Sequence, residues 1–487
     1  MTTIQQNFLR TIPGPRSFLG PYHAAFSFFN DPIGYLDTLF EEYGNLVGVK
    51  TPPMATPPNP NYPGTVFLYG PELIQQVVTE HDAYYRVAMS LGLYPVGEIT
   101  PRQEPLTRIM TGLPFLQKDE HRKHRRLMMP AFHKQAVQTY HNDMVTSTLE
   151  MLDQWKVNQR IDVSQEMLRL TMRITALTLF GQESVQEGER VGSIVEKWID
   201  YVMSLSHLLP YDLPGFRYRG WLDLSKEIET ATRMLIDNKR AAGANDHSLL
   251  SMLIQTRDRD GSSLSEDELI GHISLLLWGS RDASVYAATW TLFLLSQHPD
   301  IQADLVDELD EVLDGNSPSV EQLDQLPLLE RVIKESLRLL PPFPVIHRVL
   351  AEANELGGYS IPEGVEVIMS TYHTHRIEEI YPYPLAFNPD RWLSIQPSVF
   401  EFTPFSGGPR MCIGSSFAMQ ELKVILVLVL QRYRLELVPG ARVDRLVHVT
   451  LTPKNGIPMT VHRQDRQFQQ GVGGVRGNIR RMVKLPA

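Results

Sequence analysis

The chain has a single cysteine, Cys412, in a glycine-rich segment, 405–414, that also contains a phenylalanine and an arginine. A lone cysteine is usually a buried thiol that does no chemistry. Here an apolar helical pattern begins directly after the segment, at Ser415, and the unpaired N–H groups at a helix N-terminus favour a thiolate. The surroundings of Cys412 therefore indicate a chemically active thiolate.

Two pairs of ionisable residues are spaced so that each pair lies on one face of a helix. Glu335 and Arg338 are three residues apart, so the carboxylate and the guanidinium can hold each other. His121 and Arg125 are four residues apart, so both can donate to one acceptor. Isolated pairs of this kind are most often exposed and contribute little to stability. Their function therefore depends on the elements that lie beside them.

The spacing of residues 405–414 matches the pattern F-x-x-G-x-R-x-C-x-G, and the chain thereby resembles the cytochrome P-450 family. The resemblance implies a haem b group with Cys412 as the axial ligand of its iron. Phe405 would cover the sulfur, and Arg410 would reach a haem propionate. Gly408 and Gly414 would let the backbone pass close to the flat macrocycle. A thiolate ligand pushes electron density onto the iron and favours O–O cleavage.

The two helical pairs fit the same resemblance. Glu335 and Arg338 match the family's E-x-x-R, and Arg391 would complete a buried network that serves folding and haem retention. His121 and Arg125 match the variant H-x-x-x-R on the helix beside the haem. With Arg348, which aligns with another propionate-binding arginine, His121 and Arg125 are expected to hold the haem.

The long helix above the haem departs from the family pattern [AG]-G-x-[DE]-T-[TS]. Gly279 stands where a small residue leaves space for dioxygen, and Asp282 occupies the acid position. Ala283 replaces the threonine whose hydroxyl supports proton delivery. Ser284 lies about 100° further round the helix, so it is not a simple substitute. We assign Asp282, Ala283 and Ser284 to catalysis. A substrate hydroxyl or ordered water then supplies the missing function, or the enzyme does something other than ordinary hydroxylation.

Arg281 has two interpretations, an anchor for a carboxylate substrate, as in fatty-acid peroxygenases of the family, or a structural ion pair. It lies about 200° from Gly279 round the helix, so we expect the ion pair. The pocket is expected to draw on segments 87–111, 205–221, 275–283 and 343–346. Its predicted lining residues are Leu275, Trp278, Gly279, Val345 and Ile346. His373 and His375 are not expected to bind a metal, because they lack a further ligand at metal spacing.

The implied function is a haem-thiolate monooxygenase that uses dioxygen to oxidise a small, mostly apolar substrate. Electrons would come from NAD(P)H through a separate ferredoxin- or flavodoxin-type partner, because the chain has no cysteines for an iron–sulfur cluster of its own. Ala283 leaves open a peroxide-driven peroxygenase and a haem-thiolate isomerase. A haem-binding sensor without oxygen chemistry is an alternative of another class.

Composition limits the setting in which this chemistry occurs. The 487 residues are 43% hydrophobic and 21% charged, which is ordinary for a globular protein. The net charge of −10 gives no electrostatic basis for binding nucleic acid. No apolar run is long enough to anchor the chain in a membrane, and the single cysteine is typical of a reducing compartment. We therefore expect a cytoplasmic protein.

The helices and strands that position these residues are predicted from the period of the hydrophobic pattern and from residues that break helices and strands. Segments 45–50 and 65–70 read as strands, and helical patterns occupy most of 71–297. The longest helix starts at a capping box formed by Ser265 and Glu268 and stops before Pro299. A second capping pair, at Ser319, predicts a helix that ends at Pro341.

Short strands in 343–370 and 434–462 complete a mainly α fold with a small β portion. Because the strands are far apart in the chain, we expect one interleaved domain, assigned to residues 21–463. Residues 1–20 read as an extended leader. The basic, glycine-containing tail, 464–487, is expected to be flexible.

Overall fold

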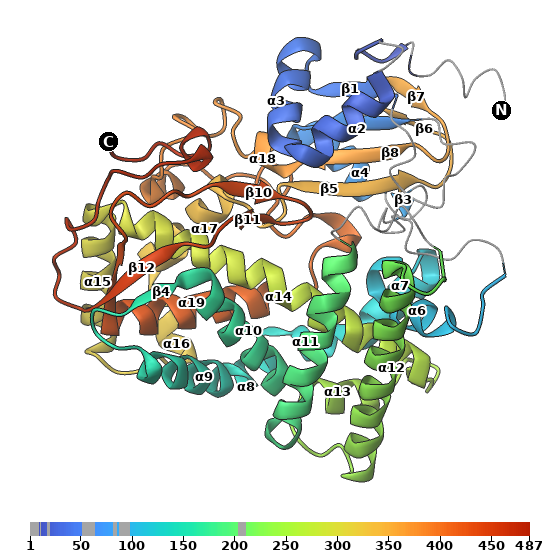
Figure 1. Ribbon diagram of the computed structural model, residues 1–487, viewed down its shortest axis with the longest axis horizontal. Helices are drawn as coiled ribbons and strands as arrows, with labels where there is room; N and C mark the ends of the chain where they lie inside the picture. The colour runs from blue at the N-terminus through green and yellow to red at the C-terminus, as the bar shows by residue number, and fades with distance from the viewer. Residues whose placement is uncertain are drawn as a thin grey trace.

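Helices make up most of this computed structural model, and a five-stranded sheet lies at one end of it (Figure 1). The structure describes residues 9, 11–16, 20–50, 64–80, 85–86, 98–202 and 211–487. The arrangement confirms a mainly α fold with a small β portion. Within these described ranges, no helix is long and apolar enough to cross a membrane.

The sheet joins strands from distant parts of the chain in the order β1-β2-β8-β5-β3. Its strands are β1 (Leu46–Val49), β2 (Thr65–Leu68), β8 (Glu366–Ser370), β5 (Val345–Leu350) and β3 (Tyr85–Arg86). β2 runs parallel to β8 with Thr65 opposite Glu366, so segments from the two halves of the chain are neighbours. This pairing confirms the single interleaved domain.

Both faces of the sheet are covered, which explains why its central strands are apolar runs. The helices on its two sides are α2 (Gly20–Asn30), α3 (Pro32–Tyr43) and α4 (Pro71–Thr79). Phe67 of β2 packs with α2 and α3. Val66 and Leu68 pack on the opposite side with α4, because successive side chains of a strand point to opposite faces.

The remaining helices form the larger part of the molecule. They are α6 (Glu104–Ile109), α7 (Lys118–Met128), α8 (Lys134–Thr139), α9 (His141–Gln154), α10 (Val163–Phe180), α11 (Val185–Val202), α12 (Arg217–Ala241), α13 (Leu249–Gln255), α14 (Glu266–Ser296), α15 (Pro299–Leu313), α16 (Val320–Leu323), α17 (Pro327–Leu339), α18 (Thr371–Thr374) and α19 (Ser415–Arg432). The smaller sheets contain β4 (Arg160–Asp162), β6 (Asn354–Leu356), β7 (Tyr359–Ile361), β9 (Tyr433–Leu437), β10 (Arg445–Val447), β11 (Leu451–Pro453) and β12 (Pro458–Arg463).

Helix α14 crosses the helical part and confirms the predicted long helix. Its 31 residues span about 47 Å. The capping box forms at its start, where Ser265 N–H donates to Glu268 Oε2 at 2.7 Å and Glu268 N–H donates to Ser265 Oγ at 3.3 Å. Because α14 packs against α10, α17 and α19, it can present side chains to the centre of the molecule along much of its length.

The helix predicted to run from Ser319 to Pro341 is in fact two helices. The capping box at Ser319 is present, but α16 ends after about one turn. Pro327 begins α17. A proline inside a helix removes a hydrogen bond and clashes with the preceding turn, whereas the first turn tolerates it. The prediction overlooked this break.

The basic tail after Arg463 is packed against the core, which corrects the expectation of a flexible terminus. Ile479, Met482 and Val483 are all 0% exposed and belong to the main hydrophobic cluster with α14 and α19. Asp465 receives a hydrogen bond from Arg434 Nε at 2.6 Å. The buried apolar side chains fix the tail, and its charges lie outside them.

The leader is also anchored where the structure describes it. Ile12 is 0% exposed, and Pro13 O accepts a hydrogen bond from Gly48 N–H at 2.8 Å. Residues 1–8, 10 and 17–19 of the expected leader lie outside the described residues.

A buried carboxylate, Glu335 of α17, contacts both predicted arginine partners. Arg338 donates to it through Nη2 at 2.8 Å and Nε at 2.9 Å, and Arg391 donates through Nε at 2.9 Å. The side chains of Glu335 and Arg338 are 0% exposed, and that of Arg391 is 4% exposed. Arg338 also donates to the carbonyls of His375 and Pro384. The charges are thus mutually satisfied, as burial requires.

Replacing Glu335 with alanine should destabilise the protein by about 3–5 kcal/mol, because two buried guanidiniums lose their carboxylate. Denaturant unfolding measures the loss. Lys334→Ala on the same helix is the control, since it removes an exposed pair with Glu330 and should cost less than about 1 kcal/mol. Equal stabilities of the two variants would show that the network is dispensable.

Truncation of Ile479 tests whether the tail belongs to the folded core. Ile479→Ala should lower the free energy of unfolding by about 2–5 kcal/mol, the range for a large-to-small change in a core. Gln469→Ala, at an exposed tail position, should stay within about 0.5 kcal/mol of wild type. A neutral Ile479→Ala variant would contradict the packing described here.

Candidate active site

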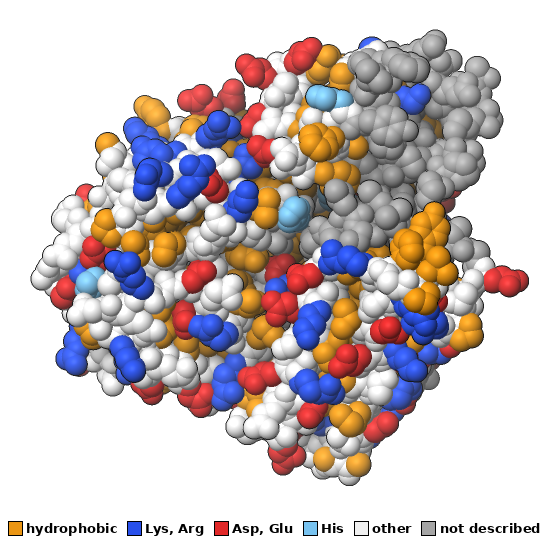
Figure 2. Space-filling model, in the orientation of Figure 1, with side chains coloured by type: hydrophobic (Ala, Val, Ile, Leu, Met, Phe, Trp, Pro, Cys, Tyr) orange, Lys and Arg blue, Asp and Glu red, His pale blue; other side chains and the backbone are white. Residues whose placement is uncertain are grey.

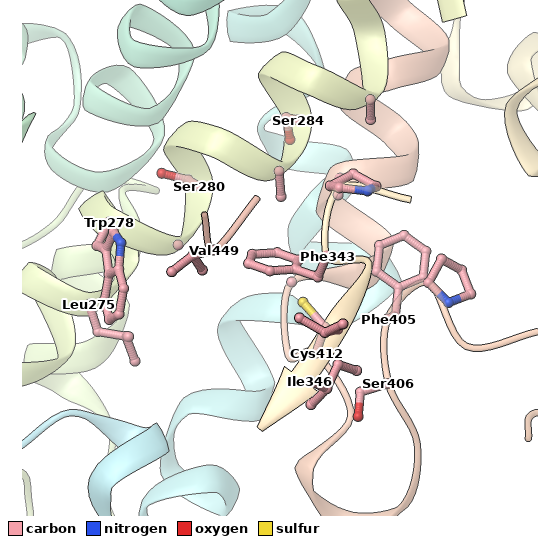
Figure 3. A pocket seen from close by; sticks show the side chains of 18 of the residues that line it. Leu275, Trp278, Ser280, Ser284, Phe343, Ile346, Phe405, Ser406, Cys412 and Val449 are labelled. Atoms are coloured by element: carbon pink, nitrogen blue, oxygen red, sulfur yellow. The ribbon is translucent and has the colours of Figure 1, made fainter. Parts of the chain in front are cut away.

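A cavity of about 740 Å³ lies between α14, the segment before α19, β5 and the loop between β10 and β11. Its lining is mostly apolar. Figure 3 shows the Cys412 sulfur pointing into it, with Phe343 and Val449 nearby and Ser280 and Ser284 along the α14 wall. An enclosed apolar space with a few polar groups is the usual form of a small-molecule site.

Cys412 opens onto the cavity and is otherwise surrounded by protein. Its side chain is accessible from within the cavity, and its N–H donates to Phe405 O at 2.9 Å, which closes the loop. Burial raises the pKa of the thiol, while the backbone N–H of Gly414 and the charge of Arg125 oppose that rise. The thiol thus has a donor and a cation that stabilise its ionised form.

The two predicted glycines of the loop differ in what surrounds them. A Cβ on Gly408 would lie 2.2 Å from Val78 O, and its φ of +66° favours glycine. The close neighbour of Gly408 on the side of its missing Cβ is therefore α4, and the expected contact of its backbone with a macrocycle stays a prediction. Gly414 has φ −90°, and its role here is the N–H directed at the sulfur.

Two cations line the cavity: Arg348, which is buried, and Arg410, which is half-buried. In the described part of the chain neither forms an ion pair with a carboxylate, and the Nε atom of each has no hydrogen-bond partner. Arg348 donates to His347 O and Arg410 to Leu116 O, each at 2.8 Å. Burial lowers the pKa of both guanidiniums to about 10. Such a pair fits a ligand that brings its own carboxylates, as the two haem propionates would.

The other predicted haem contacts, His121 and Arg125, lie on α7 and are not among the residues that line the cavity. His121 is 2% exposed. Arg125 Nη1 donates to Met411 O at 2.8 Å, so it holds the residue before the cysteine.

On α14 the structure separates the three residues assigned to catalysis. Ala283 and Ser284 line the cavity with Gly279, but Asp282 does not. Burial raises the pKa of Asp282, partly offset by the charge of Arg281 and a hydrogen bond from Thr450. A Cβ added to Gly279 would meet no atom within 4 Å, so open space lies beside it.

Arg281 forms the expected ion pair, with its Nη2 2.9 Å from Glu196 Oε1 of α11. It does not line the cavity. The other predicted pocket residues, Leu275, Trp278, Val345 and Ile346, do line it. Residues 87–97 and 205–210 of the predicted pocket segments lie outside the described residues.

The two histidines that were not expected to bind a metal have other partners. His373 Nε2 contacts Asp37 Oδ1 at 2.9 Å, and His375 Nε2 accepts from Thr403 N–H at 2.8 Å. Throughout the described ranges, no group of three or more His, Cys, Asp or Glu side chains could hold a metal ion.

Sequence reasoning missed several residues of the site. Phe26, Phe28 and Phe29 of α2 line the cavity, as does His448 in the loop after β10. The aromatic cluster in 26–29 was a visible signal, but nothing local indicates that α2 meets β5 across the cavity.

Residues 58–459 match the family model described as Cytochrome P450, and the chain belongs to the cytochrome P450 family. It is therefore an oxidoreductase that incorporates oxygen, and its family implies haem.

Three curated relatives come from Streptomyces. Cyclooctatin synthase of Streptomyces melanosporofaciens is 30% identical, with 78% of this chain and 83% of the relative covered. Cyclooctat-9-en-7-ol 5-monooxygenase of the same organism is 28% identical, and the alignment covers 88% of this chain and 90% of the relative. Pentalenene oxygenase of Streptomyces avermitilis is 28% identical, with 91% and 94% covered.

A solved structure, retinoic acid bound cyanobacterial CYP120A1, aligns with a TM-score of 0.79 at 22% identity, covering 93% of this chain and 99% of that one. At this identity the likeness bears on the fold alone, and it supports the P450 architecture.

If Cys412 is the iron ligand, the reduced, carbon-monoxide-bound protein should show the red-shifted Soret band of thiolate-ligated haem. Cys412→His should remove that band even where haem stays bound. Met411→Leu, at the neighbouring and 41% exposed position, should keep it. An unchanged spectrum of Cys412→His would mean that another residue binds the iron.

Proposed function

We propose that this protein is a monooxygenase in which Cys412 is the axial ligand of haem b and which oxidises a small, mostly apolar substrate. The observation that carries the proposal is the Cys412 thiol, which is open to a mostly apolar cavity. The same cavity is lined by two arginines, Arg348 and Arg410, that form no ion pair with a carboxylate of the described residues. When bound, haem would supply the activation of dioxygen. We further propose that the protein acts in the cytoplasm.

The chain's own residues have separable roles in this proposal. Arg348 and Arg410 would hold the haem propionates through charge-assisted hydrogen bonds. Arg125 positions Met411, and with it the cysteine, and His121 stands beside it on α7. Phe405 shields the sulfur from water. The N–H of Gly414 stabilises the thiolate and tunes its electron donation.

The substrate is proposed to be a cyclic hydrocarbon or its alcohol. Apolar side chains dominate the cavity wall. Its polar members, apart from Arg348 and Arg410, include Ser280, Ser284, His448 and the buried carboxylate Glu366, which contacts His347 Nδ1 at 2.9 Å. The relatives' names specify an alkenol, cyclooctat-9-en-7-ol, and a compound named as an alkene, pentalenene. A substrate hydroxyl near the iron would supply the function that Ala283 lacks.

Electrons are proposed to come from NAD(P)H through a ferredoxin- or flavodoxin-type protein. The chain has one cysteine, so it cannot build an iron–sulfur cluster of its own. Two basic residues of α7, the helix that carries Arg125, form ion pairs within the chain. Arg126 Nη2 lies 2.8 Å from Asp258 Oδ2, and Arg122 Nη2 lies 2.5 Å from Asp119 Oδ1. Acidic and basic side chains also mingle over the helical half of the face in Figure 2.

A peroxide-driven peroxygenase is the second candidate, and Ala283 is the observation that favours it. Peroxide is the source of oxygen as well as of electrons, so the reaction has less need of a proton relay. Against it, Arg281 pairs with Glu196 outside the cavity and does not offer an anchor for a carboxylate substrate.

Restoring the hydroxyl in Ala283→Thr tests the proposal. With an alkene that lacks a hydroxyl, the variant should form more product per NAD(P)H than wild type, because one proton-transfer contact is worth roughly 10²–10⁴-fold. With an alkenol, the same substitution should change the product formed per NAD(P)H only slightly, or it should weaken substrate binding. Binding is measured by the ferric spin-state shift.

Two results with the wild-type enzyme would contradict the proposal. If wild type couples tightly on a substrate without any hydroxyl, the interpretation of Ala283 is wrong. If wild type turns over with peroxide alone as well as with redox partners, the peroxygenase replaces the monooxygenase.

A further inference from the structure

Segments from near the two ends of the chain meet at the cavity. The α2–α3 corner, where α2 ends and α3 begins, contributes three lining residues, Phe29, Asn30 and Pro32. The hairpin tip, where β10 turns into β11, contributes three more, Val447, His448 and Val449. Figure 3 shows Val449 reaching into the cavity near Phe343. The position of the hairpin tip therefore affects the space that a substrate can occupy.

A bidentate ion pair joins the α2–α3 corner to the hairpin. Arg445 of β10 donates through Nη1 to Asp31 Oδ1 at 2.6 Å and through Nη2 to Asp31 Oδ2 at 3.2 Å. The Arg445 side chain is 5% exposed. Neither Asp31 nor Arg445 lines the cavity itself. Because a bidentate contact fixes orientation as well as distance, the pair holds two cavity walls together from outside the cavity.

The C-terminal tail binds the same strand. Asn478 Oδ1 accepts from Arg445 N–H at 2.6 Å, and Asn478 N–H donates to Asp444 Oδ1 at 2.8 Å. The next residue, Ile479, is 0% exposed and anchors the tail in the core. Arg445 is thus bound twice, by the tail through its backbone and by the α2–α3 corner through its side chain.

The hairpin needs such contacts because it is small. Strands β10 and β11 pair over three residues each, and an isolated two-stranded hairpin is at best marginally stable. The β11 side is attached through Leu451, whose N–H donates to Pro342 O and whose carbonyl accepts from Trp290 Nε1, each at 2.9 Å. These contacts do not involve Arg445. Loss of the ion pair would therefore release the β10 side and leave the β11 side attached.

Resting on the proposed function, we propose that the ion pair between Asp31 and Arg445 determines the specificity of the enzyme. Both are positioning residues that hold the hairpin tip against the α2–α3 corner, and so set which carbon of an apolar substrate can approach the site of oxidation. An apolar wall orients a hydrocarbon by shape alone, so the orientation depends on how firmly that wall is held. Asn478 makes the C-terminal tail part of this arrangement.

The first test needs no turnover. Imidazole and 4-phenylimidazole are titrated into the ferric holoprotein, and the shift of the Soret band gives the two dissociation constants. Asp31→Asn keeps a side chain that can cap α3 and removes the charge. It should strengthen the binding of 4-phenylimidazole relative to imidazole by about 10-fold, the lower end of what one methylene contributes to discrimination, because a loosened wall admits the bulkier azole. An unchanged or lowered relative affinity would overturn the proposal.

The second test asks whether Asp31 and Arg445 act as one pair. With a cyclic alkene that shifts the ferric spin state, Asp31→Asn and Arg445→Gln should each lower the ratio of the main oxygenated regioisomer to the others by about 10-fold. The double variant should do no more, because all three break the same contact. Arg445→Lys keeps the charge but loses the bidentate contact, so it should recover only part of the ratio. Effects that add in the double variant would overturn the pair.

The tail is tested in the same assay. Asn478→Ala should shift the regioisomer ratio in the same direction as Asp31→Asn, although Asn478 does not line the cavity. Lys454→Gln is the matched control, because it removes an exposed charge directly after β11 and should leave the ratio at its wild-type value. An Asn478→Ala variant with the wild-type ratio would overturn the role of the tail.

A purely structural ion pair would give a different result. Asp31→Asn and Arg445→Gln would then lower the melting temperature and leave both the azole affinities and the regioisomer ratio unchanged, and this outcome overturns the proposal. Failure of the proposed function is distinguishable from it, because it would appear as wild type forming no oxygenated product, while the azole titration would still report the shape of the cavity.

Discussion

The buried Glu335 carboxylate is the interaction on which the cysteine loop depends. It holds Arg338, whose guanidinium binds the carbonyls of His375 and Pro384, and Arg391 in the following segment. The ring of His375 in turn accepts from Thr403 N–H at 2.8 Å, only two residues before the loop that closes between Phe405 and Cys412. A continuous set of contacts thus runs from α17 to the start of the loop that carries the thiol, while Glu335, Arg338 and Arg391 themselves do not line the cavity.

Some polar side-chain atoms on the cavity wall have no hydrogen-bond partner among the described residues, and they differ in the ligand groups that they could bind. The cations Arg348 and Arg410 lie without carboxylates and fit a dianionic ligand. Most of the rest of the lining is apolar, so it gives a hydrocarbon substrate a favourable environment.

Local signals were predictable from the sequence, and contacts between distant segments were not. The capping box at Ser265 and the loop around Cys412 are formed by residues close together in the chain, so both could be predicted from the sequence. The tail was misread because its apolar residues are irregularly spaced among glycines and are buried only by segments far away in the chain. The contact between Gly408 and α4 could not be predicted, because α4 lies hundreds of residues earlier in the chain.

The central claim is that this chain uses its haem-thiolate site to insert one oxygen atom from dioxygen into a hydrocarbon-like substrate. Isotope labelling tests this most directly. The reconstituted enzyme is given NAD(P)H, a redox partner system, a cyclic alkene or alkenol that shifts the ferric spin state, and ¹⁸O₂ in unlabelled water. The account predicts a product that carries one ¹⁸O atom per molecule. A product without ¹⁸O, or a rearranged substrate with no added oxygen, would contradict it.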